Sequence, residues 1–239
     1  MKTILTAIIA AAVSSTAAAQ DYKHYELNVG EFHELEVTDA INVDYEHNSY
    51  KAGKVEFDAT SDVADAIIFR PAQGKLQIEL ATRDTVYPTL PTVRVYSSFL
   101  SKISNEGDST VRVITINPGP TLDARLIGNG RLVLRDVRTT NADMSILTGR
   151  GTLVVYGTAE NTHFNITGAG TIQADEFRSN AVSCTLTGTG SLFCYPGKTL
   201  NVKGMGSIKV YYRGNPKIKK SWLSNAKIIS LDDESAEKK

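Results

Sequence analysis

ARLIGNGRLVL, at residues 124–134, is the first of five similar segments in this chain of 239 residues. The other four read SILTGRGTLVV (145–155), FNITGAGTIQA (164–174), CTLTGTGSLFC (184–194) and LNVKGMGSIKV (200–210). Each segment has Gly-x-Gly at its centre, and the first glycines follow one another at spacings of 21, 19, 20 and 16 residues. Repetition at about this period is typical of a solenoid.

Apolar and polar residues alternate on both sides of each Gly-x-Gly. Three positions of the repeat are apolar in all five copies and form three columns. The first column, two residues before the first glycine, is Leu126, Leu147, Ile166, Leu186 and Val202. The second, two residues after the second glycine, is Leu132, Leu153, Ile172, Leu192 and Ile208, and the third, four residues after it, is Leu134, Val155, Ala174, Cys194 and Val210. The positions next to the glycines on the other parity are mainly Thr, Ser, Lys and Arg. This period of two indicates strands that bury one face.

A unit of this size cannot bury an apolar face alone, so successive units must stack. The predicted fold class is all-β: a right-handed parallel β-helix, or β-solenoid, with coils of about 20 residues, irregular N-terminal coils and capped ends. Trp222, Leu223, Ile228 and Ile229 are expected to supply the C-terminal cap. The alternative is that each Gly-x-Gly is a hairpin turn in an antiparallel sandwich or barrel. Hairpins do not explain the third apolar column.

The N-terminus has the pattern of an export signal, with Lys2 before an apolar core and Ala17-Ala18-Ala19 as a cleavage site. The predicted organisation is a cleaved signal peptide at 1–19, one β-solenoid domain at 20–231 and a charged tail at 232–239. Within the domain we expect irregular coils at 20–120, regular repeats at 121–212 and a cap at 213–231. The expected location is the periplasm, the outer-membrane surface or the medium, without an integral membrane segment.

Charge disfavours nucleic acid as a partner. The chain has 26 basic and 26 acidic residues, whereas nucleic-acid binding calls for a clustered basic surface. The two charge runs, Lys217 to Lys220 and Asp232 to Lys239, are interpreted as a solvated corner and a frayed terminus.

The sequence offers no recognisable catalytic or metal site. Asp123, Asp136, Asp143 and Asp175 stand at different positions in the repeat, so we do not expect them to stack; His24, His33, His47 and His163 are far apart. No nucleophile elbow, zinc helix or phosphate loop occurs. We therefore predict no catalytic residue, no metal and no cofactor, and a protein that is not an enzyme. Cys184 and Cys194 form either a disulfide, which export permits, or two free buried thiols.

One outward column suggests binding. Five residues after the second glycine of each repeat stand Arg135, Tyr156, Asp175, Tyr195 and Tyr211. In a parallel stack they are predicted to form a ladder on which sugar rings or a partner's side chains could lie. The alternative interpretation is that Tyr simply favours exposed strands.

The order of the segments resembles the putative auto-transporter adhesin, head GIN domain family. The likeness rests on Phe32, Leu35, Val37, Ile41 and Val43, then Gly74, Leu76 and Ile78, then Val93, Val95, Leu100 and Ile103, and finally the Gly-x-Gly array. Ser104-Asn105-Glu106-Gly107 departs from the Ser/Gly-rich pair that the family shows there. The resemblance implies a β-helical fold, export in Gram-negative bacteria and an adhesive role, and it brings no catalytic residues.

Three functions remain open at this point. The first is an exported adhesin-like or ligand-binding module of the bacterial envelope that recognises glycans or surface proteins. The second is a structural or assembly protein of the envelope, which self-association as a homo-oligomer would favour. The third is a carbohydrate-active enzyme, which would need a cluster of acids.

Overall fold

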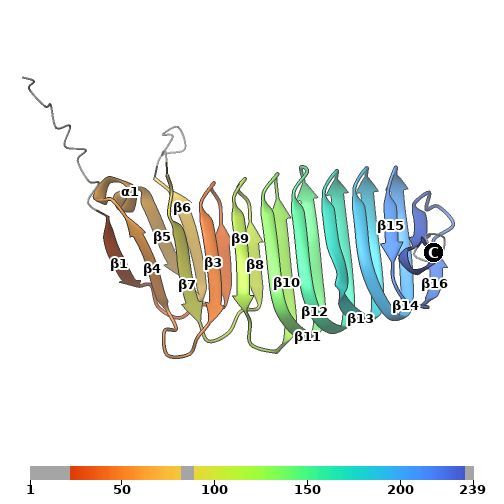
Figure 1. Cartoon of the computed structure of the whole chain (residues 1–239), viewed down its shortest axis with the longest axis horizontal. Helices are drawn as coiled ribbons and strands as arrows, with labels where there is room; N and C mark the ends of the chain where they lie inside the picture. The colour runs from red at the N-terminus through yellow and green to blue at the C-terminus, as the bar shows by residue number, and fades with distance from the viewer. Residues whose placement is uncertain (1–21, 82–88, 235–239) are drawn as a thin grey trace, which may run out of the picture.

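The computed structural model describes residues 22–81 and 89–234. The predicted signal peptide at 1–19 lies outside these ranges. The molecule is an elongated stack of coils, with β1 (Lys23–Asn28) at one end and the C-terminal strands at the other (Figure 1). The solenoid has about six turns of roughly 20 residues each. The predicted all-β parallel solenoid is therefore confirmed.

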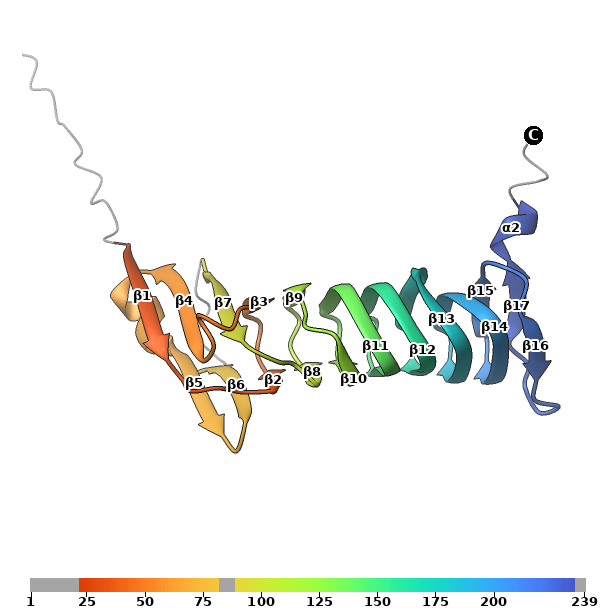
Figure 2. The same cartoon turned by 90° about the horizontal axis from the view of Figure 1, so that it is seen from below.

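The regular part consists of long strands that each bend once. They are β10 (Gly119–Ile127), β11 (Arg131–Thr148), β12 (Thr152–Gly168), β13 (Thr171–Gly188) and β14 (Ser191–Gly206). Each pairs in parallel with the next along the stack, and the view from below shows them as successive coils (Figure 2). The parallel pairing rules out the antiparallel hairpin alternative for the repeats.

Each coil contributes to two sheets. We call the first sheet the one built from residues that follow each Gly-x-Gly, such as Leu132 in register with Leu153 and Val111. The second sheet is built from residues that precede it, such as Ala124 in register with Met144 and Ile103. The inward side chains of the two sheets form one continuous apolar core. Complete burial of such side chains contributes about 1.5–3 kcal/mol each before conformational entropy is counted.

The N-terminal part has the same two sheets but a different chain path. Its elements are β2 (Glu34–Val37), β3 (Asn42–His47), β4 (Lys54–Ala59), α1 (Ser61–Ala66), β5 (Ile67–Ala72), β6 (Lys75–Leu80), β7 (Thr92–Ser97), β8 (Lys102–Asn105) and β9 (Thr110–Thr115). β2 lies between β6 and β8, and β3 lies between β7 and β9. The chain thus places β2 third from the end of the second sheet and β3 fourth from the end of the first, and it then returns to build the outer strands. Antiparallel pairs of β1 with β4 and of β5 with β6 close this end.

Glycine is required at the corners for two reasons. The first glycine of each corner has φ between 81° and 125°, a region that favours glycine. A Cβ on Gly188 would also collide with the carbonyl oxygen of Gly168 in the coil before it. The second glycine faces inward, and a Cβ on Gly190 would meet the carbonyl oxygen of Gly170. The Gly-x-Gly repeat is therefore explained by the close contact between the backbones of successive corners.

The three predicted columns need a corrected register in two of the repeats. Ile146, not Leu147, lies beside Leu126, because the pairing shifts between Leu126 and Ile127 and leaves one extra residue in the next coil. In the fifth repeat Gly206, not Gly204, lies beside Gly188. The last spacing is therefore 18 residues rather than 16. As a result Val210 is in register with Leu192, a position that the sequence assigned to Ile208.

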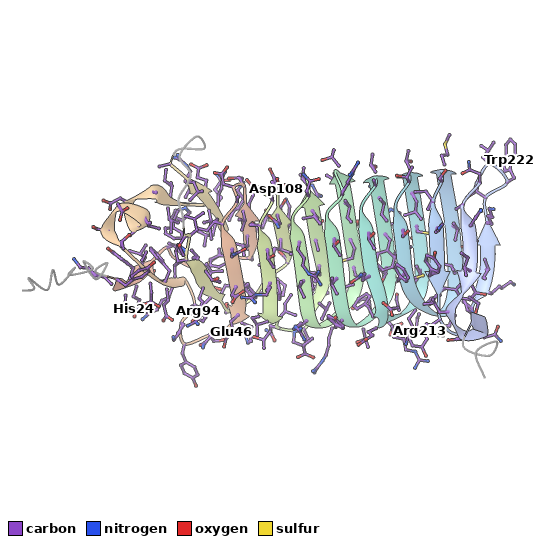
Figure 3. The ribbon with its side chains drawn as sticks, turned by 45° about the horizontal axis from the view of Figure 1, so that its top comes forward. His24, Glu46, Arg94, Asp108, Arg213 and Trp222 are labelled. Atoms are coloured by element: carbon purple, nitrogen blue, oxygen red, sulfur yellow. The ribbon has the colours of Figure 1, made fainter. Side chains whose placement is uncertain are left out.

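The C-terminal end differs from the predicted cap. The two sheets end with three short strands, β15 (Lys209–Tyr212), β16 (Lys217–Lys220) and β17 (Lys227–Ser230). The short helix α2 (Leu231–Glu234) follows β17. Trp222 and Leu223 are 89% and 65% exposed and do not cover the core; Trp222 projects from this end in Figure 3. Ile228 is partly buried against the core. The charge run Lys217 to Lys220, predicted to be a corner, is strand β16 and pairs with β14.

Candidate functional site

A groove of about 540 Å³ runs along the outer face of the second sheet, across six neighbouring coils. We call it the polar groove. Its lining residues are Ser101, Thr121, Leu122, Asp123, Asn141, Ala142, Asp143, Asn161, Thr162, His163, Ala181, Val182, Ser183 and Asn201. Most of these side chains carry a hydrogen-bonding group, which distinguishes the groove from an apolar small-molecule pocket.

Parallel register places one outward residue of each coil in a straight file along this groove. Asp123 pairs with Asp143, Asp143 with His163, His163 with Ser183, and Ser183 with Asn201. The prediction that Asp123 and Asp143 do not stack is therefore wrong. It counted positions from the glycines, and the extra residue at Leu147 moves Asp143 one place further from its own glycine. A count corrected for that residue would have found the file.

Hydrogen bonds hold several of these side chains in place. Arg125 donates from Nε and Nη2 to the two carboxylate oxygens of Asp123, at 3.1 and 2.7 Å. This bond to the carboxylate raises the pKa of Arg125 above its usual value. His163 Nδ1 lies 3.0 Å from Ser183 Oγ. Asn161 donates to the side-chain oxygen of Asn141 at 3.1 Å, so amides on successive coils are linked along the groove.

The file contains catalytic residue types, but its geometry favours binding. Ser183 and His163 could act as a nucleophile and its base, and two stacked acids occur in glycosidases. However, the backbone N–H groups of a parallel ladder bond to the neighbouring coil, so they are not free to stabilise an oxyanion beside Ser183. Both side-chain oxygens of Asp123 are engaged by bonds from Arg125. The groove therefore offers fixed donors and acceptors.

The five residues predicted to form a binding ladder lie near one bend of the coil but not in one file. Arg135 stands over the ring of Tyr156, with 5.4 Å from its guanidinium carbon to the ring centroid. Tyr156 is in register with Glu176 instead of Asp175. Tyr195 is in register with Arg178, and Tyr211 with Phe193. The prediction of a single straight ladder is wrong, because the strands shift register at this bend.

The aromatic rings in this region are in contact with neighbouring side chains of the same protein. Arg178 stands 5.6 Å over Tyr195, and Phe193 stacks on Tyr211 with ring centroids 4.6 Å apart. Each of the three predicted tyrosines thus has one ring face covered by a neighbouring side chain. Asp175 forms an ion pair with Arg213 at 3.3 Å. Beside them lies a smaller hollow of about 320 Å³, lined in part by Tyr156, Asp175 and Phe193. Ligand binding by the five predicted residues stays a prediction.

Cys184 and Cys194 are free, buried thiols, so the disulfide alternative is not what the structure shows. Burial raises the pKa of Cys184 to about 12 and the pKa of Cys194 well above its usual value. Both thiols are therefore neutral near pH 7 and poor nucleophiles. They contribute to the core.

Two negative findings apply to residues 22–81 and 89–234. In this part of the chain no three His, Cys, Asp or Glu side chains gather closely enough to hold a metal ion. No helix in the same residues has the length and apolar character needed to cross a bilayer.

Solved structures from Bacteroides and Parabacteroides species have the same architecture. A putative adhesin from Bacteroides fragilis is 20% identical, with a TM-score of 0.78 over 89% of this chain and 96% of that one. A protein from Parabacteroides distasonis described as a putative lipid binding protein is 19% identical, with a TM-score of 0.70 over 88% and 96%. A putative adhesin from Parabacteroides merdae is 17% identical, with a TM-score of 0.71 over the same shares. At these identities the likeness concerns the fold alone.

No curated protein matches this chain. The family model described as putative auto-transporter adhesin, head GIN domain, matches residues 31–216, which include both the irregular coils and the Gly-x-Gly array. The resemblance drawn from the sequence is thereby confirmed, and the chain belongs to the putative auto-transporter adhesin, head GIN domain family.

Proposed function

We propose that this protein is an adhesin-like module of the bacterial surface that binds an extended glycan in the polar groove. The observation that carries the proposal is the groove itself, in which five neighbouring coils present polar side chains in register. Family membership supports the general adhesin-like role. The location at the cell surface and the choice of a glycan belong to the proposal.

The chemistry of the groove suits a chain of hydroxyl groups. Equivalent side chains on neighbouring coils are separated by the spacing of adjacent strands, about 4.8 Å. Asn141 and Asn161 each offer both donors and acceptors, and His163 and Ser183 extend the row. A regular row of this kind can bond to successive sugars of one polymer. A shallow, open surface also leaves the ends of such a polymer free.

A lipid fits the groove less well. One of the similar structures is described as a putative lipid binding protein. An acyl chain, however, calls for an enclosed apolar cavity, whereas most of the residues that line the open polar groove carry a carboxylate, amide, hydroxyl or imidazole group. A glycan is therefore the better match.

A structural or assembly role in the envelope is the second candidate. The observation that favours it lies at the C-terminal end, where β16 and β17 each pair with one strand, β14 and β15, among the residues that the structure describes. Unpaired edge strands are templates for association with another chain. Purified protein that forms fibres or closed oligomers and ignores glycans would favour this function.

The direct test is a glycan-array screen with the purified protein, followed by titration of the best ligand. Replacing the exposed Asp143 and Asn161 with Ala should weaken binding at least about tenfold, since each removes a hydrogen-bonding group from the groove. Gln173→Ala is the matched control, because Gln173 is an exposed residue of the same stack on the first sheet. Equal loss in the control would argue against the groove.

A second variant tests whether the glycan binds at the tyrosine region instead of the polar groove. Replacing Tyr156, Tyr195 and Tyr211 with Ser should leave glycan affinity unchanged if the polar groove is the site. Loss of binding in this triple variant, with normal binding in the groove variant, would move the site to the tyrosine region. Turnover of the bound glycan would instead point to the enzyme that the sequence left as the third possibility.

A further inference from the structure

The polar groove continues into a second hollow at the C-terminal end of the same sheet. This hollow measures about 520 Å³ and shares Ser183 and Asn201 with the polar groove. Its other lining residues are Val202, Lys203, Lys219, Lys220 and Ser221. We call Lys203, Lys219 and Lys220 the lysine group. The file that begins with Asp123 and Asp143 thus ends at Lys219, which is in register with Asn201.

The lysine group lacks the anionic partners that other lysines of this sheet have. Lys75 pairs with Glu36 at 3.1 Å, and Lys102 pairs with Glu34 at 3.4 Å. Among residues 22–81 and 89–234, no acidic side chain forms an ion pair with any member of the lysine group. All three are exposed. The outer face of the second sheet therefore has compensated charge at its N-terminal end and uncompensated positive charge at its C-terminal end.

We infer that the lysine group binds an oxyanion carried by the glycan, so that the ligand is an acidic polysaccharide bearing carboxylate or sulfate groups. This inference rests on the proposed function and specifies its ligand class. Like charges on neighbouring strands repel, and an anion between them removes that repulsion. Lysine is suited to the task because its ammonium is a flexible point charge that can reach anions of several shapes.

The opposite charges at the two ends of the groove orient the bound ligand. Asp123 and the exposed Asp143 lie at one end of the file, and Lys219 lies at the other. An anionic substituent is repelled from Asp143 and attracted to the lysine group. Neutral sugars occupy the middle of the groove, where His163, Ser183 and Asn201 supply hydrogen bonds. The backbone of the second sheet fixes the distance between the two ends.

The experiment compares matched pairs of glycans by titration calorimetry at two salt concentrations. One pair is a sulfated oligosaccharide, such as a heparin fragment, and its desulfated form. The other is an oligogalacturonate and its carboxyl-reduced form. In each pair the anionic member should bind the wild-type protein about tenfold more tightly, and this advantage should shrink at high salt.

The test variant is Lys203→Gln together with Lys219→Gln. Both side chains are exposed and make no ion pair in the described structure, so the fold should be retained. The variant should lose about tenfold in affinity for the anionic glycans and bind the neutral ones as the wild type does. Lys209→Gln is the matched control, because Lys209 is an exposed lysine in β15 on the first sheet. It should change neither affinity.

The outcomes separate the inference from the proposed function. Equal wild-type affinity for both members of each pair overturns the lysine inference and leaves glycan binding intact. Unchanged affinity in the double glutamine variant overturns it as well. Absence of binding to every glycan overturns the proposed function and the inference with it. Equal binding to polyglutamate or single-stranded DNA of the same charge would show a general attraction to polyanions, which also overturns the inference.

Discussion

The N-terminal half and the Gly-x-Gly array build the same two-sheet cross-section in different ways. In the array each strand pairs with the coil before and after it, and equivalent residues are about one repeat apart, as Leu153 and Ile172 are. In the N-terminal half the neighbours come from distant parts of the chain. Arg112 forms a bidentate ion pair with Asp44, 68 residues away, and the hydroxyls of Tyr45 and Ser97 lie 2.9 Å apart. The array is stabilised by contacts between successive repeats, and the N-terminal half is stabilised by specific contacts between residues that are far apart in the sequence.

The comparison shows that a continuous core does not require a continuous repeat. Val111 of β9 lies in register with Val43 on one side and with Leu132 of the array on the other. Ile103 of β8 joins Leu35 to Ala124 in the same way. The apolar columns therefore cross the boundary without interruption. The stack needs only matching apolar strands, whatever their order in the chain.

The largest predicted effect concerns corner glycines in the two halves. Gly188→Ala should destabilise the protein by roughly 3 kcal/mol or more, because it adds a positive-φ alanine whose Cβ collides with Gly168 in the preceding coil. Gly30→Ala in the N-terminal half should cost only about 1 kcal/mol, since Gly30 also has positive φ but has no atom within 4 Å of an added Cβ. Urea unfolding of both variants measures the difference. Equal losses would mean that close corner packing adds nothing.

The second prediction concerns the junction. Asn105 is buried at the inward position next to Leu126, and its amide donates to the carbonyls of Ser109 and Arg131. Asn105→Leu continues the apolar column but removes both of these bonds and the bond that the buried Gly107 N–H donates to Asn105 Oδ1, so it should lower the free energy of unfolding by about 2–3 kcal/mol.

Ser145→Ala is the control for this junction, since within residues 22–81 and 89–234 the buried Ser145 hydroxyl donates only one long hydrogen bond, to Asp143 at 3.5 Å. That variant should lose less than about 1 kcal/mol. A leucine variant as stable as the wild type would show that the array could extend through the junction without a polar residue.

As the pH rises, the array should lose stability at a lower pH than the N-terminal half does. Both cysteines lie in the array, and burial raises the pKa of each. The folded state thus keeps thiol protons that the unfolded state releases above about pH 9, and stability falls as pH rises. Between pH 9 and 10 the wild type should lose about 1 kcal/mol per thiol relative to Cys184→Ala/Cys194→Ala.

Tyr45 provides the N-terminal comparison, because burial raises its pKa to about 12 from an ordinary value of 10. Its contribution should decline only above about pH 10. Denaturant titrations across this pH range measure both effects. Identical pH slopes for the wild type and the double alanine variant would contradict the assignment of the early loss to the thiols.

The smallest predicted effect concerns the long-range ion pair. Asp44→Asn removes the carboxylate that raises the pKa of Arg112 through a hydrogen bond. The pair is partly exposed, so the variant should lose only about 0.5 kcal/mol at low salt and less at high salt. Thermal unfolding at both salt concentrations checks this. A loss above 2 kcal/mol would mean that the N-terminal half depends on charge more than on its apolar columns.

Much of the array could be predicted because its signal is local. Leu132, Leu153 and Ile172 keep a constant distance from their glycines, so counting places them in one column. Counting failed at Leu147 and at Gly204, where coils gain or lose residues between corners. It also failed for Tyr156, because the register shifts at the bend. These shifts were enough to hide the stacking of Asp123 on Asp143 and to suggest a tyrosine ladder that is not straight.

The sequence by itself favoured the parallel stack, since stacked units bury alternating apolar residues that recur at a fixed period, and hairpins do not explain the third apolar column. Only the tertiary structure decided which outward residues are neighbours, and with them the polar groove and the lysine group. The physical reason is that backbone hydrogen bonds between coils set the register. Those bonds accommodate an inserted residue at a bend at little cost, and this moves the side chains that precede it by one place. The order of the N-terminal coils was decided in the same way, by contacts between segments that are far apart in the chain.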